Sequence, residues 1–263
     1  MILQTLILLL LIFGICVISY RGALHEFQIL QKEYKSDIRW SEILYEQLPI
    51  VIRNAPPSWL GNWNLQKTGT KTWNVSVQVK KGKKILMPFS KWIRYPNSVA
   101  ENRSDLGKQV RLNLTIQNWT NFRKWSWLPP TTPIPYVLSN LPNNSFFGLK
   151  KTVADATAIV STDGVPLEIW ISHEAGIPSS IVEELRGLNP WIQSTNEIPG
   201  VENVKYIEML LRPRNILILP CHWWFALRSV QSNSSDLRLS WFWIHEFQNP
   251  VSFLATALDR RPL

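Results

Sequence analysis

The stretch that decides the fold of this chain spans residues 216–227 and reads ILILPCHWWFAL. It begins with four consecutive aliphatic residues, reaches a proline at position 220, and continues with three aromatic residues in a row. Short apolar runs bounded by turn residues are typical of strands that are buried on both faces. The sequence therefore predicts two adjacent antiparallel strands, 216–220 and 224–230, joined at Cys221–Trp223.

Apolar runs and period-two alternation predict further strands over residues 49–56, 73–79, 85–87, 110–116, 154–161, 167–173, 205–211 and 236–245. Helical patterns cover residues 24–48, 88–93 and 250–260, and Ser179 and Ser180 begin a short helix. Many short strands separated by turn residues are typical of a jelly roll. The expected fold class is mainly β with flanking helices, a double-stranded β-helix or jelly roll.

Residues 2–19 are almost wholly apolar. As a helix they would extend about 27 Å, close to the roughly 30 Å hydrocarbon core of a bilayer. We therefore expect a single-pass membrane protein in which residues 1–20 are the anchor and residues 21–263 form one domain. A signal peptide cleaved after Ser19 is the alternative, although the basic residues that usually begin such peptides are missing.

The orientation of this anchor has two conflicting indicators. Arg21, Lys32 and Lys35 follow the apolar segment while no basic side chain precedes it, which favours a cytosolic C-terminal domain. Glycosylation motifs, which would instead require a lumenal domain, occur at Asn74, Asn102, Asn113, Asn118, Asn143 and Asn233. We take the cytosolic side as the expectation, and occupied glycosylation sites would indicate the lumenal one.

The net charge of +9 is concentrated in one third of the chain. Residues 67–124 contain 13 Lys and Arg but only two acidic residues, a net charge of +11, so the rest of the chain sums to −2. The contact surface that we expect here comprises Lys80, Lys81, Lys83, Lys84, Arg123 and Lys124. Its expected partner is a protein or an anionic surface rather than nucleic acid. Lysines at a hairpin tip also discourage strand pairing between molecules, which is the simpler explanation.

Two segments of the chain resemble the jumonji-type, cupin-like hydroxylases. They are Pro49–Pro56, which reads PIVIRNAP, and residues 216–227. In that family an apolar strand ends in proline, and a Trp-Trp or Trp-Tyr pair leads to a histidine that binds iron. The resemblance covers about residues 24–245 and implies a jelly-roll fold. Degenerate members with an N-terminal membrane span are similar to cupin-like proteins of large DNA viruses, which implies a role in a virion or at an internal virion membrane.

The resemblance also implies that the iron ligands are lost. The family binds Fe(II) through a His-x-Asp/Glu pair and a distant histidine, with open positions for 2-oxoglutarate and oxygen. Phe225 occupies the position of the distant histidine, and Leu167 and Ile169 occupy the expected His-x-Asp/Glu positions. Neither an aromatic ring nor an aliphatic side chain can donate a lone pair to iron.

The expected function is therefore a non-catalytic binding or structural module with no cofactor and no catalytic residue. The alternative is a 2-oxoglutarate-dependent hydroxylase with an unorthodox metal site formed by His173, His222 and Glu168. The simplest reading of His222 is a turn residue that stacks on Trp223. Whether the three side chains of the alternative site converge distinguishes the two functions.

Overall fold

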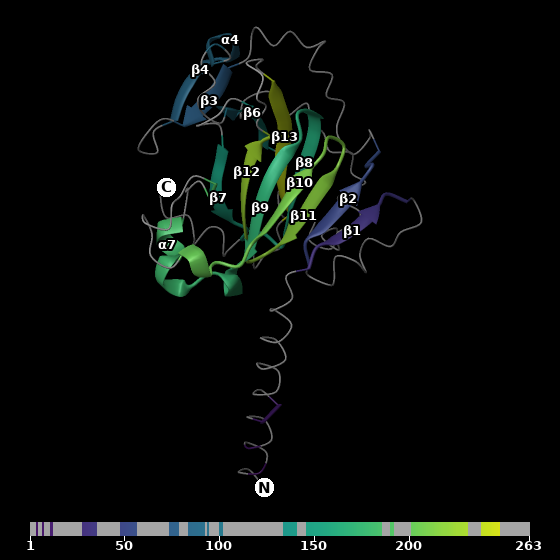
Figure 1. Ribbon diagram of the computed structural model, residues 1–263, viewed down its shortest axis with the longest axis vertical. Coiled ribbons are helices and arrows are strands. Elements are labelled where there is room, and N and C mark those ends of the chain that lie inside the picture. The colour runs from purple at the N-terminus through teal and green to yellow at the C-terminus, as the bar shows by residue number, and fades with distance from the viewer. Residues whose placement is uncertain are drawn as a thin grey trace, which may run out of the picture.

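The computed structural model describes residues 28–35, 48–56, 74–78, 84–92, 94, 100–101, 134–140, 146–185, 190–191, 201–230 and 238–247, together with residues 4, 7, 11 and 12. Two sheets of mainly antiparallel strands dominate this part of the chain (Figure 1). The single parallel pair described joins β1 and β2. The chain is therefore mainly β, as expected.

The larger sheet contains nine strands in the order β1 (Leu30–Glu33), β2 (Ile50–Arg53), β11 (Ile216–Pro220), β8 (Ala156–Gly164), β13 (Leu239–Phe247), β6 (Ile134–Ser139), β5 (Ala100–Glu101), β3 (Asn74–Gln78) and β4 (Lys84–Pro88). The smaller sheet has the order β10 (Ile207–Leu211), β9 (Leu167–His173), β12 (Trp223–Ser229) and β7 (Phe146–Lys151). The short helices described are α4 (Phe89–Trp92), α7 (Val182–Leu185) and the 3-10 turns η4 (Glu174–Gly176), η5 (Ser179–Ile181) and η6 (Val201–Asn203).

The main core lies between the two sheets. Residues that alternate along β8, β11 and β13 of the larger sheet meet residues that alternate along β9 and β12 of the smaller one. The members with no exposed surface are Leu138, Ile159, Leu167, Ile169, Ile171, Leu211, Leu217, Leu219, Leu227 and Phe242. Because side chains on a strand point alternately to its two faces, this cluster uses only half of each strand.

The other half of these strands is buried too. On the outer face of the smaller sheet, Trp170 and Trp224 pack with Ile177, Ile181 and Val204 from the segments carrying the 3-10 turns. On the outer face of the larger sheet a second cluster includes Ile50, Ile216 and Trp243. Burial on both faces explains why β11 and β12 read as continuous apolar runs rather than as alternating ones.

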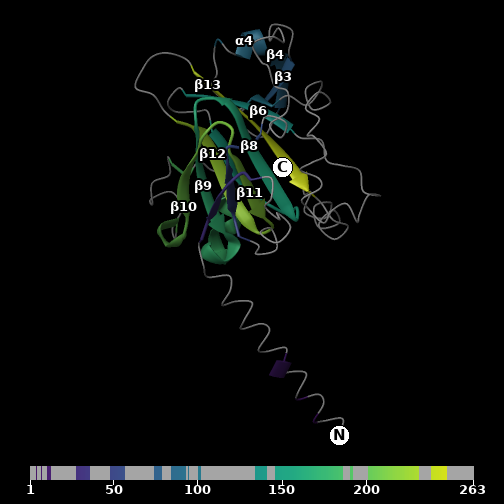
Figure 2. The same cartoon turned by 90° about the vertical axis from the view of Figure 1, so that its right-hand side faces the viewer.

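The predicted strand boundaries around the opening stretch are confirmed within one residue, but the predicted pairing is wrong. β11 pairs with β2 and β8 in the larger sheet, whereas β12 pairs with β7 and β9 in the smaller one. The turn at Cys221 and His222 therefore crosses between the sheets instead of closing a hairpin (Figures 1 and 2). Because β11 and β12 lie in different sheets, each is a central strand with a paired strand on either side, β2 and β8 for β11 and β7 and β9 for β12.

The helical pattern predicted over residues 24–48 is also wrong in part, because residues 30–33 form β1. β1 lies beside β2 in parallel register, and hydrogen bonds from the Leu30 and Tyr34 N–H groups to the Pro49 and Arg53 carbonyls tie the two segments. The pairing therefore overrides the local helical periodicity. The sequence analysis assigned no strand to β5, β6 or β7, which lie in or beside the Pro- and Asn-rich middle of the chain.

Several predictions fall on residues outside the described part of the chain. They concern the strand 110–116, the helix 250–260, Arg123, Lys124, Lys80, Lys81, Lys83 and the glycosylation motifs after Asn74. Of residues 2–19, only Gln4, Ile7, Leu11 and Ile12 are described, and all four are helical. Among the described residues, no helix is both long enough and apolar enough to span a bilayer.

Gly164 is the last residue of β8 and precedes the two-residue connection, residues 165–166, to β9. Its φ is +89°, which L side chains rarely adopt, and a Cβ added there would lie 1.9 Å from the Leu239 carbonyl oxygen. The Val165 N–H donates to the same carbonyl, so β13 cannot move away without losing that bond. The glycine therefore sets how closely β8 and β13 approach.

We expect Gly164→Ala to destabilise the protein by more than about 2 kcal/mol, because it combines strained backbone with a clash against backbone. Urea unfolding of the two proteins measures the difference. Ser180→Ala, a change at an exposed position, is the control and should shift the free energy of unfolding by less than about 0.5 kcal/mol. Equal stability of Gly164→Ala and the wild type would contradict this reading of the turn.

Candidate functional site

Phe225 lies at the centre of the interior between the two sheets. It is 1% exposed and stacks on Phe147 of β7 with ring centroids 5.7 Å apart and an interplanar angle of 6°. Phe147 also meets Tyr136 and Phe242 of the larger sheet in edge-on contacts. Phe147 therefore lies between Phe225, at the position that the resemblance gives to an iron ligand, and the aromatic rings of the larger sheet.

The register of β12 against β9 gives the place of the suspected positions Leu167 and Ile169 relative to Phe225. Ile171 lies directly across from Phe225 on β9, while Ile169 faces Leu227 and Leu167 faces Ser229. All three of these β9 side chains belong to the apolar interior and are fully buried. Leu167 and Ile169 are thus in the same buried cluster as Phe225. They are not paired with it, however, because Ile169 lies two residues and Leu167 four residues before Ile171 on β9.

The other neighbour of Phe225 is Lys150 on β7. Its ammonium group lies 2.9 Å from a carboxylate oxygen of Glu246 in the larger sheet. A protonated lysine has no lone pair to donate. The residues paired with Phe225 on both adjacent strands, Ile171 and Lys150, therefore do not fit a histidine–carboxylate iron site.

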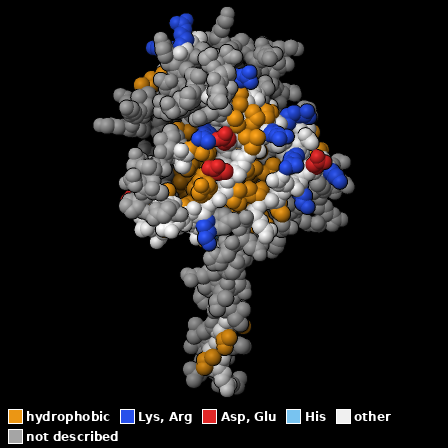
Figure 3. All heavy atoms as spheres, in the orientation of Figure 1, with side chains coloured by type: hydrophobic (Ala, Val, Ile, Leu, Met, Phe, Trp, Pro, Cys, Tyr) orange, Lys and Arg blue, Asp and Glu red, His pale blue; other side chains and the backbone are white. Residues whose placement is uncertain are grey.

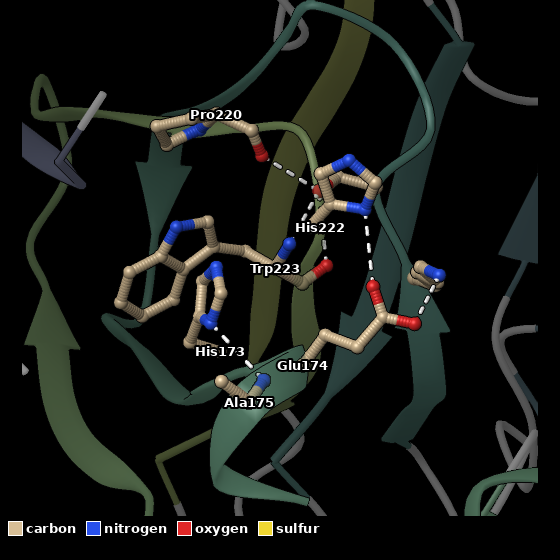
Figure 4. Close-up of polar contacts among 8 residues, drawn as sticks. His173, Glu174, Ala175, Pro220, His222 and Trp223 are labelled. Atoms are coloured by element: carbon tan, nitrogen blue, oxygen red, sulfur yellow. Dashed lines mark hydrogen bonds and ion pairs between the residues drawn. The ribbon is translucent and has the colours of Figure 1, made fainter. Parts of the chain in front are cut away.

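A polar cluster lies at the end of β9 and joins three segments (Figure 4). Glu174 receives the Lys151 ammonium at 2.6 Å on one carboxylate oxygen, and its other oxygen lies 3.0 Å from His222 Nδ1. His173 points to the other side of the strand, where its ring meets Trp223 edge-on at 5.2 Å. The His173 Nδ1 atom accepts a hydrogen bond from the Ala175 N–H at 3.1 Å and caps η4.

Glu168 takes no part in this cluster. Its carboxylate is bound by the Arg228 guanidinium, which in turn lies 4.6 Å from the centre of the Trp191 ring. Glu168 precedes His173 by five residues, or about 16 Å along an extended strand. The alternative metal site formed by His173, His222 and Glu168 is therefore not assembled.

The turn that carries His222 is fixed by Thr152. The Thr152 hydroxyl lies 2.7 Å from the Pro220 carbonyl and accepts the Trp223 N–H at 2.9 Å, and its backbone exchanges hydrogen bonds with His222 and Trp223. His222 adopts a φ of +67°. Asn, Asp and His are the side chains most tolerant of this conformation, apart from glycine. The prediction of His222 as a turn residue is confirmed, but its ring pairs with Glu174, and it is His173 that contacts Trp223.

The environment shifts the pKa of two of these groups. Burial lowers the pKa of His173, and the nearby His222 and Lys151 charges lower it further against the opposing effect of Glu174. Burial alone would raise the pKa of Glu174, but the hydrogen bonds and charges of Lys151 and His222 outweigh it and the net pKa is lowered. The cluster therefore favours a neutral His173 beside an ionised Glu174.

This arrangement supplies little chemistry beyond an ion pair. A histidine oriented by a carboxylate is one half of many nucleophilic sites, and Cys221 is the adjacent residue. Burial raises the pKa of the Cys221 thiol, with a contribution from Asp155, and so disfavours the reactive thiolate. In the described part of the chain, no three His, Cys, Asp or Glu side chains are grouped to hold a metal ion.

Two residues of the cluster were missed by the sequence analysis. Lys151 ends β7, a strand that was not predicted, and Thr152 acts through its hydroxyl on a turn about 70 residues further along the chain. Neither has a local sequence signal. The pair Lys150–Lys151 could be noted as two charges at a strand end, but only the fold gives them different partners.

Comparisons with known proteins do not assign this chain to a family, since no protein-family model matches it and no curated protein matches it significantly.

We expect stability to fall as the pH is lowered from about 7 to about 5. The unfolded chain takes up a proton on His173 near its ordinary pKa of about 6.5, whereas the folded chain resists it, so stability present above that pH is lost below it. The lowered pKa of Glu174 adds a second loss, as the pH falls from about 4.3 through its folded pKa. Urea unfolding at a series of pH values measures both.

His173→Asn tests the first part of this expectation. An asparagine oxygen can accept the Ala175 N–H but does not titrate, so the loss of stability between about pH 7 and pH 5 should shrink. Glu184→Gln, which removes an exposed carboxyl elsewhere, should leave the profile unchanged. An unchanged profile for His173→Asn would show that His173 does not carry the effect.

Proposed function

We propose that this protein is a membrane-anchored, non-catalytic jelly-roll module with a binding or structural role. The observation that carries the proposal is the Phe147–Phe225 stack between the sheets. By the resemblance, Phe225 of this stack stands at the position of the distant iron-binding histidine, and the residues paired with Phe225 on the adjacent strands offer neither a histidine nor a carboxylate.

The order of the strands supports the jelly-roll assignment. From β6 onward the chain alternates between the sheets, except that β9 and β10 are consecutive in the smaller one. Eight strands thereby form two four-stranded layers, β11-β8-β13-β6 and β10-β9-β12-β7. Two antiparallel sheets of four strands connected in this way are the arrangement of double-sheet jelly rolls. The strands β1 to β5 then extend the larger layer at both edges.

The N-terminal residues support the anchor. The side chains of Ile7, Leu11 and Ile12 lie on helical turns and are about half exposed, at 52%, 58% and 49%. Exposed aliphatic side chains in an apolar 18-residue segment are stabilised by a lipid environment. With the resemblance to cupin-like proteins of large DNA viruses, this supports a structural role at an internal virion membrane, with the C-terminal domain on the cytosolic side.

We expect the purified full-length protein to bind no stoichiometric Fe(II) and to release no succinate from 2-oxoglutarate. Phe225→His should not restore either property, because a single histidine faces Ile171 and Lys150 and no carboxylate completes the set. Metal analysis after anaerobic loading, together with a succinate assay, measures this. Near-equimolar iron with turnover in the wild type would favour the hydroxylase alternative instead.

The anchor has its own test. We expect the mature chain in membranes to retain residues 2–19 and to resist extraction with alkaline carbonate. N-terminal sequencing and fractionation of the expressed protein measure this. A mature chain that begins near Tyr20 would identify a cleaved signal peptide, and occupied glycosylation motifs would place the domain in the lumen.

A further inference from the structure

β10 is the outermost strand of the smaller sheet, because it pairs with β9 on one side and ends the strand order there. The larger sheet extends further at the same edge, where β2 and β1 follow β11 (Figures 1 and 2). Ile207 and Met209 of β10 pack against the interior cluster to which Val51 of β2 belongs. A strand added to β10 would therefore lie over β2 and β1.

The hydrogen bonds of β9 show which of its residues face β10. At one end of the β9–β12 pairing the Val230 N–H donates to the Pro166 carbonyl at 3.0 Å. At the other end the Glu174 N–H donates to the His222 carbonyl at 2.9 Å. In antiparallel sheets, successive residues direct their N–H and C=O groups to opposite sides of the strand. The even-numbered residues of β9 therefore bond β12, and the odd-numbered residues bond β10.

The register of β9 against β10 extends this alternation to the edge of the sheet. Ile169 lies directly opposite Met209. Met209 therefore directs its N–H and C=O groups to β9, while its neighbours Glu208 and Leu210 direct theirs to the outer edge. Among the described residues, no strand pairs with that edge.

The side chains along this edge are exposed and partly apolar. Leu210 is 46% exposed, Glu208 is exposed, and Tyr206, which precedes the strand, is 53% exposed and stacks on Trp170 at 5.2 Å. Natural edge strands are commonly protected by proline, lysine or an irregular register. β10 contains neither residue, and its register with β9 is regular. Its edge is therefore open to another strand.

Three exposed arginines lie near the C-terminal end of β10. They are Arg212 and Arg214, in the connection to β11, and Arg53, at the end of β2. The Arg214 carbonyl accepts the Ala55 N–H at 3.0 Å, and the Arg214 N–H donates to the Ser161 carbonyl at 2.9 Å, so this connection is held against its neighbours. Lys and Arg side chains gather over β1 and β2, beside hydrophobic side chains of the smaller sheet (Figure 3). This end of the edge favours acidic groups in a partner.

We propose that β10 binds an extended segment of a partner protein as a further antiparallel strand, with acidic residues of that segment beside Arg212 and Arg214. When a strand is added to a sheet edge, main-chain hydrogen bonds give affinity and alternate side chains give specificity. The backbone of Glu208 and Leu210 supplies those bonds, and the Leu210 side chain supplies an apolar contact. The arginines select the acidic segment and its direction.

A second copy of the chain is a less suitable occupant of this edge. Two β10 strands in antiparallel pairing would be related by a twofold axis perpendicular to the smaller sheets. The larger sheets of both copies would then lie on the same side of the paired strands. β2 and β1 extend each larger sheet towards the other copy, so the two sheets would compete for one space. A single extended segment has no such sheet.

This inference rests on the binding role proposed above and gives it a class of partner. It does not depend on the missing iron ligands or on the membrane anchor. Failure of peptide binding would leave the result of the iron and succinate measurements unchanged. Iron-dependent turnover, in contrast, would refute the non-catalytic function without altering binding at β10, so the two failures are distinguishable.

The test uses the full-length protein in mild detergent and the fluorescent peptide Glu-Glu-Val-Leu-Val-Thr-Val-Thr, blocked at both ends. Its β-branched residues favour an extended strand, and antiparallel pairing places its glutamates beside Arg212. We expect a saturable rise in fluorescence polarisation. A peptide with lysines in place of the glutamates should bind about tenfold more weakly or worse, because like charges then meet at the arginines.

Hydrogen exchange identifies the edge directly. In the free protein the amides of Glu208 and Leu210 should exchange rapidly, and saturation with the peptide should slow them by about tenfold or more. The Met209 amide, which is bonded to β9, should exchange slowly with and without the peptide. It is the internal control for a strand that is formed in both states.

Variants separate the backbone of the edge from its side chains. Leu210→Pro removes an outward N–H without breaking a bond to β9, and it should weaken binding by about tenfold or more. Leu210→Thr keeps the N–H and suits a strand, so it should weaken binding by less than about threefold. Near-UV circular dichroism checks that both variants are folded.

Arg212→Glu tests the charge independently of any effect of proline on folding. It should weaken binding of the glutamate peptide by about tenfold. The matched control is Lys91→Glu on α4, which makes the same change of net charge at another exposed position and should leave binding unchanged.

The proposal would be overturned if the wild type bound neither peptide or bound both equally. Wild-type affinity in folded Leu210→Pro, or in Arg212→Glu, would also exclude β10 as the binding edge, as would unchanged exchange of the Glu208 and Leu210 amides. A dimer in sedimentation that Leu210→Pro dissociates, without any binding of peptide, would instead identify a second copy as the occupant.

Discussion

Burial of β12 on both faces is the constraint on which the described structure depends. Trp223, Phe225 and Leu227 face the interior between the sheets, while Trp224 and Ala226 face the cluster under the 3-10 turns. Each buried aromatic or leucine side chain contributes about 1.5–3 kcal/mol through removal from water. A strand that contributes to two cores must be central in its sheet, and β12 lies between β7 and β9.

The turn that leads into a central strand must be held in one place so that the strand pairs in the correct register. The polar cluster at the end of β9 holds the turn before β12. Thr152 holds the backbone of the turn before β12, and Glu174 holds the side chain of His222 and the end of β7 through Lys151. The crossing from one sheet to the other takes only two residues. His222 accepts the left-handed backbone that so short a crossing requires. The hydrogen bonds and ion pairs of this cluster therefore hold β7, the end of β9 and the turn before β12 together, which is a structural role.

The sequence predicted much of the fold because apolar runs identify buried strands directly. β8 to β13 were all found, and the alternation of Leu167 and Ile169 placed both on one face. The pairing of the strands could not be predicted in the same way, since an apolar run such as ILILP can pair equally well with any other apolar strand. Hence β11 and β12 were predicted to pair with each other. β1 was predicted as helix because its backbone partners in β2 lie 20 residues further along the chain and leave no local signal.

At the candidate site, too, the sequence predicted which residues are buried but not which residues are neighbours. Phe225 was identified from its place after Trp-Trp, and the structure puts it in the interior with the suspected positions Leu167 and Ile169. The register, which depends on tertiary contacts, instead sets Ile171 and Lys150 beside it. Glu168 was a plausible ligand by type, but strand alternation turns it to the outer face, where Arg228 binds it. Residue types thus indicated which chemistry to look for, and only the fold could say which atoms meet.

The Phe147–Phe225 stack has a consequence for how such an interior can change over evolutionary time. Replacing one large buried aromatic side chain by a smaller one costs about 3–5 kcal/mol, a substantial part of the 5–15 kcal/mol by which most proteins are stable. A ligand set between these sheets would need at least three replacements, and none of them is useful until all are present. Selection would have to tolerate each weakened intermediate without any gain in activity. An interior filled by stacked aromatic rings is therefore much easier to retain than to convert into a ligand site, while the exterior of the same fold stays free to acquire new contacts.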